Sequence, residues 1–294
     1  MFLCRERAAA SGARGSAAGT DTRLMPLLVC ATPIGNLEDV TLRVLHELAR
    51  VDLILCEDTR RTRVLLDRHS IQAKLLSFER HMEARRTAEV LPRLEAGDRV
   101  ALVSDAGLPA VNDPGQRLIA AAHERSLPVV VLPGPSAVET ALVASGLVAE
   151  RYLFLGYLPR GEAALAELWK ELRAWPWPSV AFESPRRLPR SLASLAAHEP
   201  TLMLAVCREL TKRFEDVVRG TAIELADRFS EGTRGEITLV LGARSSEQQT
   251  AAGEDDAVEA VAELIAGGTP RRTAARVVGR LTGQPPNRLY KRSL

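Results

Sequence analysis

The sequence lacks several features that would assign the chain to a specialised class. Its 294 residues contain no run of about 18 apolar residues, so no membrane-spanning helix is expected. Aromatic residues make up only 4% of the chain, and the 39 Lys and Arg exceed the 37 Asp and Glu by two. A net charge of +2 is too small to indicate a nucleic-acid partner, so that question depends on where the charges lie.

Cysteine is scarce as well. Cys4, Cys30, Cys56 and Cys207 lie far apart, without C-x-x-C spacing and without a nearby histidine, which excludes a zinc motif or a disulfide framework. The last three lie inside apolar runs, where a reduced, buried thiol is expected. These features favour a cytoplasmic protein with no metal.

Residues 1–24 are rich in Ala, Arg, Ser and Gly and lack the apolar stretch of a secretory signal. We expect a flexible tail here, with Met25 as an alternative start. An organelle transit peptide has a similar Arg- and Ser-rich, acid-poor composition. The Arg and Ala bias of the whole chain disfavours that alternative.

Between residues 27 and 146, short apolar runs alternate with amphipathic stretches. One such stretch, residues 41–50, predicts a helix with Leu42, Leu45 and Leu48 on one face. Continuous apolar strands with crossover helices between them favour a mainly parallel sheet covered on both faces. The predicted strands are 27–30, 53–56, 75–78, 100–103 and 129–132.

A second α/β block follows, and the polar, acidic composition after residue 244 is typical of a linker. The predicted units are a first lobe at 25–147, a second lobe at 148–243, a linker at 244–256 and a small basic helical domain at 257–294. Because clefts between domains are favoured ligand sites, we expect the site between the lobes. Strands of the second lobe are predicted at 152–155, 179–183, 202–207, 214–219 and 236–241.

Three predicted strands of the first lobe run directly into loops rich in Gly and Pro, at residues 32–36, 104–109 and 133–137. In an open parallel sheet, ligands collect at the carboxyl ends of the strands. Asp105 comes too early to cap the following helix, and Ser136 is placed to open one. The first loop lacks G-x-G-x-x-G spacing, which disfavours a dinucleotide.

Six ordered segments between residues 27 and 242 give a specific resemblance. They are T-P-I-G-N-L-x-D-x-T, C-E-D-T-R, S-D-A-G-x-P-x-x-N-D-P-G, L-P-G-P-S-A, F-E-S-P-x-R-L and R-E-L-T-K. In this order they resemble the ribosomal RNA small subunit methyltransferase I family. The resemblance implies a two-lobed α/β tetrapyrrole-methylase (class III methyltransferase) fold with a small C-terminal helical domain.

The resemblance also implies an activity, a cofactor and partners. It implies methyl transfer from S-adenosylmethionine to the ribose 2′-oxygen of a cytidine in the decoding region of 16S rRNA, within the small ribosomal subunit, by a homodimer. The residues that match the family's cofactor contacts are Pro33, Ile34, Gly35, Asp105, Leu108, Ser136, Ala137, Phe182 and Cys207.

Two positions depart from the family pattern: Leu108 replaces the usual Thr, and Arg186 replaces the usual His. Leu108 removes a hydroxyl that could contact the cofactor and leaves backbone and apolar contacts. Neither departure removes a candidate catalytic group.

A sulfonium methyl donor needs no metal, but a general base would help to remove the proton of a ribose hydroxyl. The acidic side chains at predicted strand ends are the candidates, and the sequence does not choose among them. Positioning of the reactants without a base is the alternative. The candidates are Glu57, Asp58, Asp105, Glu183 and Glu209.

Positive side chains recur beside the predicted cleft and through residues 271–294, which contain no acid. Such clusters are typical of surfaces that bind phosphate, although a solvated helix face in an Arg-rich chain has the same composition. Tyr157 or Phe78 would provide stacking surfaces for RNA. The RNA-binding candidates are Arg60, Arg61, Arg186, Arg187, Lys212, Arg271 and Arg272, with Arg190 and Arg213 near them.

Two other functions are compatible with this sequence. One is C-methylation of a porphyrinoid such as a precorrin on the same fold, because a fold does not fix its substrate. The basic C-terminal segment and the E-D-T-R and R-E-L-T-K segments disfavour it. The other is a ribosome-assembly factor that binds RNA without catalysis, which an absence of cofactor binding would indicate.

Overall fold

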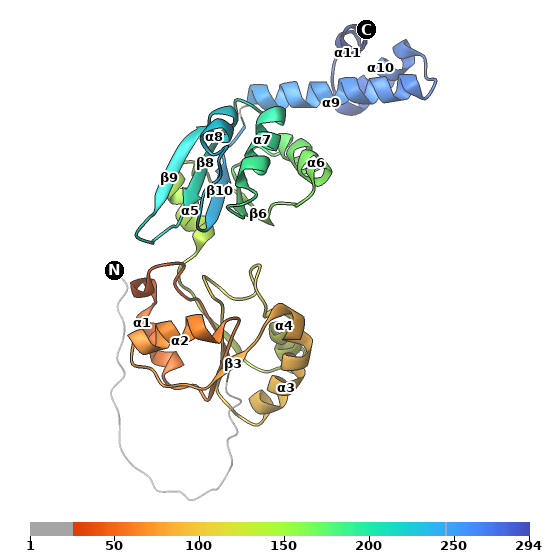
Figure 1. Cartoon of the computed structure of the whole chain (residues 1–294). Helices are drawn as coiled ribbons and strands as arrows, with labels where there is room; N and C mark the ends of the chain where they lie inside the picture. Colours follow the sequence, from red (N-terminus) through yellow and green to blue (C-terminus); the bar gives the residue numbers. More distant parts are fainter. Residues whose placement is uncertain (1–25, 245) are drawn as a thin grey trace, which may run out of the picture.

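The computed structural model of the protein describes residues 26–244 and 246–294. The expected N-terminal tail, the alternative start at Met25 and Cys4 lie outside these ranges. The described chain forms two α/β lobes and a helical C-terminal unit that extends away from the second lobe (Figure 1). None of the described helices is long and apolar enough to cross a membrane.

The first lobe contains a parallel five-stranded sheet of order β3-β2-β4-β1-β5. Alternate residues of each strand face opposite sides, so Leu27 and Val29 pack toward α3 and α4 while Leu28 and Cys30 pack toward α1 and α2. Both faces are therefore buried, as the apolar runs predict. The strands are β1 (Leu27–Cys30), β2 (Leu53–Cys56), β3 (Leu75–Ser77), β4 (Val100–Val103) and β5 (Val129–Leu132).

The crossover helices of this lobe begin at polar residues. Thr41 caps α1, and the Asp58 side chain accepts the N–H of Arg60 at the start of α2. The prediction that Leu42 lies on the buried face of α1 is wrong. Leu42 is 85% exposed, and Val44 is buried instead. The helices are α1 (Leu42–Leu48), α2 (Thr59–Arg68), α3 (Glu83–Glu95) and α4 (Gln116–Glu124), with short 3₁₀ turns η1 (Leu37–Asp39) and η2 (Arg80–Met82).

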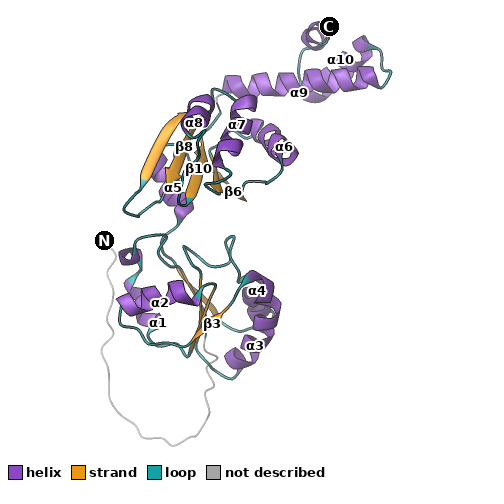
Figure 2. Cartoon of the chain, in the orientation of Figure 1, coloured by secondary structure: helices purple, strands orange, loops and turns teal. Residues whose placement is uncertain are grey.

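The second lobe has a mixed sheet of order β6-β7-β10-β8-β9, in which only β6 and β7 are parallel. Figure 2 shows its strands in orange, with β6, β8 and β10 labelled. Three helices cover one of its faces, and α5 (Ala137–Ser145) covers the other. The strands are β6 (Leu153–Tyr157), β7 (Ser179–Glu183), β8 (Met203–Arg208), β9 (Asp216–Thr221) and β10 (Ile237–Leu241), and the three helices are α6 (Glu162–Arg173), α7 (Leu188–His198) and α8 (Ala222–Arg228).

Two features of the second lobe differ from the sequence expectations. Helix α5 precedes the predicted boundary at 147/148 but packs on the second sheet, since its Val138, Ala141 and Leu142 join the core around Val240. The strand expected at 214–219 is β9, Asp216–Thr221, because residues 209–215 form a tight loop. The other predicted strands agree with the structure to within two residues.

The C-terminal unit consists of α9 (Ser246–Ala266), α10 (Arg271–Thr282) and α11 (Pro286–Arg292) around a small core of its own. The segment predicted as a linker, 244–256, is helical from Ser246 onward. Its Glu, Gln and Ala residues favour a helix, and this propensity outweighs the polar composition that suggested a linker. An ion pair between Lys170 and Glu259 joins α6 to α9.

Candidate functional site

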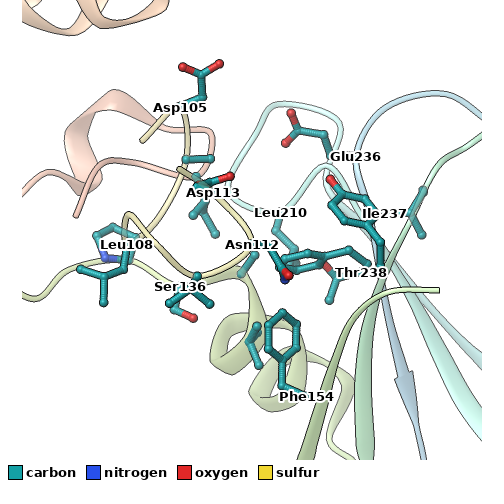
Figure 3. A pocket seen from close by; sticks show the side chains of 18 of the residues that line it. Asp105, Leu108, Asn112, Asp113, Ser136, Phe154, Leu210, Glu236, Ile237 and Thr238 are labelled. Carbon is teal, nitrogen blue, oxygen red and sulfur yellow. The ribbon is translucent and has the colours of Figure 1, made fainter. Parts of the chain in front are cut away.

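A cavity of about 920 Å³ lies between the two lobes. Its first-lobe side is built from the loops that follow β1, β2, β4 and β5, at the carboxyl ends of parallel strands, and the sequence predicts those after β1, β4 and β5. Its second-lobe side is built from β6, β7 and β10. Figure 3 shows Asp105, Asp113 and Glu236 around one part of this space, with Ser136 and Phe154 in another.

Five of the predicted cofactor residues from the first lobe line this cavity: Ile34, Asp105, Leu108, Ser136 and Ala137. Leu108 also packs against the first-lobe core, and its side chain offers the cavity an apolar surface without a hydroxyl. A neighbouring cavity of about 290 Å³ is lined by Pro33 and Gly35 and shares Asp105 and Arg61 with the larger one.

The loop after β4 is held in one conformation by its own polar groups. Thr32 donates a hydrogen bond to the Ser104 carbonyl (2.9 Å), and the Ser104 hydroxyl donates to the Gly107 carbonyl (2.9 Å). The Asp105 carboxylate accepts the Asp58 N–H (3.0 Å) and lies 3.6 Å from the Arg61 guanidinium. Asp105 is therefore oriented before any ligand arrives.

Two more carboxylates of the first lobe line the cavity, in surroundings that disfavour their charged form. Burial raises the pKa of Glu57, and the negative charge of Asp105 raises it further. Burial and the charges of Glu57 and Asp105 together raise the pKa of Asp113 to about 6. A cationic ligand would relieve this repulsion, which makes the cavity suitable for a positively charged group.

Asn112 provides a second indication of a polar ligand. Its backbone lies in the left-handed region (φ +64), and its side chain lines the cavity. The side-chain nitrogen is buried and has no hydrogen-bond partner in the structure. Because a buried donor without a partner is costly, this group is suited to a ligand acceptor such as a carboxylate or a hydroxyl oxygen.

The second sheet forms an apolar wall. Phe182, Thr238 and Cys207 are directly paired across β7, β10 and β8, so their side chains share one face of the sheet. Phe182 and Thr238 line the cavity, and Phe154 packs edge-on against Phe182. The Cys207 thiol is fully buried beneath α5, where it donates a weak hydrogen bond to the Ala141 carbonyl, and it lines neither cavity. Burial raises its pKa to about 12, so the thiol is neutral and unreactive.

Gly35 lines the smaller cavity and also lies against the second lobe. A Cβ atom built there would lie 2.5 Å from Cγ of Lys212 and 2.8 Å from the Leu210 carbonyl oxygen. The N–H of Asn36 donates to the Thr211 hydroxyl (3.0 Å) beside it. The T-P-I-G-N loop thus contacts the R-E-L-T-K loop directly, and Gly35 permits this approach of the two lobes.

Three of the predicted base candidates are already committed to structural contacts. Asp58 caps α2, and hydrogen bonds from the Arg60 side chain and N–H lower its pKa to about 2. The buried Glu183 carboxylate faces α7, where it pairs with Arg187 and accepts hydrogen bonds from Ser191 and the Ser184 N–H.

Glu209 is committed in the same way. Its carboxylate accepts hydrogen bonds from Lys212 Nζ (2.9 Å) and the Glu236 N–H (2.8 Å). Burial alone would raise the pKa of Glu209, but these bonds lower it overall. Geometry therefore favours Glu57 and Asp113 as proton acceptors, since both face the cavity.

The predicted RNA-binding cations divide into paired and free groups. Arg60 and Arg187 pair with Asp58 and Glu183, and Arg187 also donates to the Leu158 carbonyl. Lys212 pairs with both Glu209 and Glu236. Arg61 pairs with Asp105 and lines both cavities, and Arg186 is exposed.

In the C-terminal unit, acids from α9 compensate part of the positive charge. Arg288 and Arg292 form ion pairs with Glu254, and Arg292 also pairs with Asp255. Arg271 is half-buried, and the exposed side of α10 presents Arg272, Arg276 and Arg280 at four-residue spacing. The free charge of this unit is therefore smaller than its sequence suggests, and within the described residues most of it lies along α10.

Sequence reasoning missed Asn112, Asp113 and Glu236 as lining residues. Asp113 precedes a proline and matches a helix-cap pattern, which concealed its place in the cavity. Of the two predicted stacking groups, Tyr157 is 61% exposed and lines the cavity, whereas Phe78 is buried in the first-lobe core and is unsuitable.

Comparison with known proteins identifies a matching family and several relatives of similar sequence. Residues 26–226 match the tetrapyrrole (corrin/porphyrin) methylases. The ribosomal RNA small subunit methyltransferase I of Mesorhizobium japonicum is 39% identical over 271 residues, which cover 91% of each chain. The protein of the same name from Thermotoga maritima is 41% identical over 222 residues, which cover 74% of this chain and 98% of the relative.

Solved structures resemble this fold more distantly. Uroporphyrin-III C-methyltransferase from Thermus thermophilus, in complex with S-adenosyl homocysteine, is 17% identical with a TM-score of 0.55. The match covers 74% of this chain and 97% of that one. Nearly the whole Thermotoga relative aligns with about three quarters of this chain. The remaining quarter of this chain has no counterpart in that relative.

Proposed function

The chain belongs to the ribosomal RNA small subunit methyltransferase I family of tetrapyrrole methylases, and we propose that it methylates the ribose 2′-oxygen of a cytidine in the decoding region of 16S rRNA. The methyl donor is S-adenosylmethionine. Identity of 39% over 91% of both chains with a relative of that name is the observation that carries the proposal. The assembled small subunit is the proposed substrate, in the cytoplasm.

The cavity fits the donor by size, charge and polarity. Its volume of about 920 Å³ lies in the range of cofactor sites, and six acidic residues line it. When bound, S-adenosylmethionine supplies a methyl group that its positively charged sulfur has already activated. Asp105 and Asn112 offer an acceptor and a donor to the polar parts of the ligand, and Phe182 and Leu108 offer apolar contacts.

The remaining chemical task is to remove one proton from the attacking hydroxyl. Asp113 is the group we assign to this step, because it faces the cavity and its pKa of about 6 lies near neutral pH. Glu57 lies beside it and helps to keep that pKa high. Asp105 has a different role, since Arg61 and the Asp58 N–H already hold its carboxylate.

The predicted domain division and homodimer belong to the same proposal. The two lobes together form the donor cavity, and the C-terminal unit is a separate basic element for RNA. Sedimentation of the purified protein at micromolar concentration tests the dimer, which should have twice the mass of the 32.0 kDa chain.

The activity is tested with small subunits from cells that lack the gene. Incubation with labelled S-adenosylmethionine should place one 2′-O-methyl group in the decoding region, detected as a ribose resistant to alkaline cleavage. Calorimetry on the same preparation should show donor binding. Donor binding without incorporation into subunits would refute the proposed substrate, and methylation of a precorrin instead would identify a porphyrinoid enzyme.

A further inference from the structure

Phe214 is more exposed than any other aromatic residue in the described ranges, at 66%. It lies in the loop that joins β8 to β9, two residues after the R-E-L-T-K segment ends at Lys212. Exposing a phenylalanine to water is unfavourable, and most aromatic side chains of this chain are buried or line the cavity. The proposed transfer chemistry does not use this ring.

The loop that carries Phe214, residues 209–215, is tightly hydrogen-bonded. The Lys212 N–H donates to the Glu209 carbonyl, and the Glu215 N–H donates to the Lys212 carbonyl. The Glu215 carboxylate accepts the N–H of Thr211. Glu209 (φ +52) and Thr211 (φ +64) adopt left-handed conformations that these bonds support. The position of Phe214 is therefore fixed before any partner binds.

The same loop lies at the edge of the two cavities. Leu210 lines the larger cavity and Lys212 lines the smaller one. Thr211 accepts a hydrogen bond from Asn36 in the first lobe. Figure 1 shows the β8–β9 hairpin extending from the second lobe toward the first. A group bound on Phe214 would therefore lie beside the opening through which a substrate ribose must enter.

The charge next to the ring is also distinctive. Lys212 is neutralised by Glu209 and Glu236, whereas Arg213 forms no ion pair within the described part of the chain. The Arg213 guanidinium lies 5.5 Å from the centroid of the Phe214 ring. An aromatic ring beside an unpaired arginine is the combination that proteins use to stack an unpaired nucleobase and to contact its phosphate.

We propose that Phe214 and Arg213 form a stacking site for an unpaired RNA base next to the methylated nucleotide. This inference rests on the proposed rRNA activity and adds a specific contact to it. The base would lie on the accessible part of the Phe214 ring, with Arg213 near its phosphate. The contact would hold the target ribose at the cavity and would not take part in methyl transfer.

The test compares Phe214→Ala with Phe214→Trp, using assembled small subunits as substrate. Loss of the stack should raise the KM for subunits about tenfold, within the range known for base–aromatic stacking, and leave kcat unchanged. Affinity for S-adenosylmethionine, measured by calorimetry, should be unchanged in both variants. Phe214→Trp should restore the KM. Ile223→Ala removes a comparably exposed apolar side chain (59%) from α8 and should change nothing.

The inference would be overturned by an unchanged KM in Phe214→Ala, by a failure of tryptophan to restore it, or by a change in sedimenting mass that shows the ring to be a contact between protein copies. Binding of a short single-stranded RNA, followed by anisotropy, is measured in parallel. If the wild-type protein methylates no subunits, the proposed activity fails, and equal RNA binding by Phe214→Ala would separately refute the stacking site.

Discussion

Glu57 and Asp113, which the first lobe presents to the cavity, lie in surroundings unlike those of Glu183 and Glu209 in the second lobe. Burial and the negative charge of nearby Asp105 raise the pKa of both carboxylates of the first pair. The second pair is held by Arg187, by Lys212 and by hydrogen bonds. Carboxylates whose partners are incomplete are available for chemistry, and carboxylates with complete partners stabilise the fold.

The largest expected effect is on catalysis, from Asp113→Asn. If Asp113 accepts the proton, kcat/KM of the wild-type enzyme rises with pH through about 6 and levels off above it, because the acceptor must be deprotonated. The variant should lose this limb and about 100-fold in kcat/KM. A pH profile between 5 and 8 measures both, and Asp58→Asn, which keeps a helix cap, should retain the wild-type profile.

The same substitution should change stability in the opposite direction. Because the folded state raises the pKa of Asp113 from 3.8 to about 6, stability falls as pH rises between these values and stays lowered above them. Asp113→Asn should therefore melt at a higher temperature than the wild type above pH 6 and at the same temperature below about pH 4. A lower Tm at neutral pH would contradict this account.

Glu183→Ala should affect stability and not chemistry directly. It leaves the Arg187 guanidinium without its carboxylate beside a buried site, which we expect to cost about 3 kcal/mol of unfolding free energy. Denaturant titration followed by circular dichroism measures the change. Glu57→Ala is the matched first-lobe variant and should lose less than about 1 kcal/mol, and equal losses in the two variants would remove the contrast between the lobes.

A smaller effect is expected from the free arginines of the C-terminal unit. Replacing Arg272, Arg276 and Arg280 by alanine should raise the KM for subunits several-fold and reduce the slope of log affinity against log salt by about 2. The triple variant Arg85, Arg93 and Arg125 to alanine removes the same charge from the first lobe and serves as the control. Equal slopes in both would exclude a phosphate contact by α10.

The smallest effect concerns Leu108, which occupies a position where a hydroxyl is expected. Leu108→Thr should tighten donor binding about two- to tenfold, the value of one net hydrogen bond. Leu108→Val introduces a side chain of nearly the same shape as threonine but without the hydroxyl. It therefore separates the effect of the hydrogen bond from the effect of changed packing. Calorimetry on both variants provides the comparison, and equal affinities would show that no donor atom lies near this side chain.

The sequence predicts the layers and the strand ends well because both depend on local patterns. Buried parallel strands are continuous apolar runs, and the Gly- and Pro-rich loops that follow them converge at one edge of the sheet. The roles of individual carboxylates were harder to predict. Glu183 and Phe182 are adjacent in sequence and both line the cavity, yet strand alternation directs the Glu183 carboxylate toward Ser191 of α7.

Contacts between distant segments account for the remaining errors. The packing of Gly35 against Lys212 and the neutralisation of Arg288 by Glu254 each join residues far apart in the chain. No local pattern indicates such contacts. The linker prediction failed for a different reason, because acidic Ala- and Gln-rich segments are typical of both linkers and exposed helices.

The position of α5 has a consequence for the order in which the chain can fold during synthesis. The first sheet is complete once β5 has emerged from the ribosome, but α5 buries its apolar side chains against β8 and β10, which are made about 60 to 100 residues later. Until then Val138, Ala141 and Leu142 have no sheet to cover. A split protein divided at 147/148 would separate this helix from its sheet, whereas a division within residues 133–136 keeps each packing unit on one fragment.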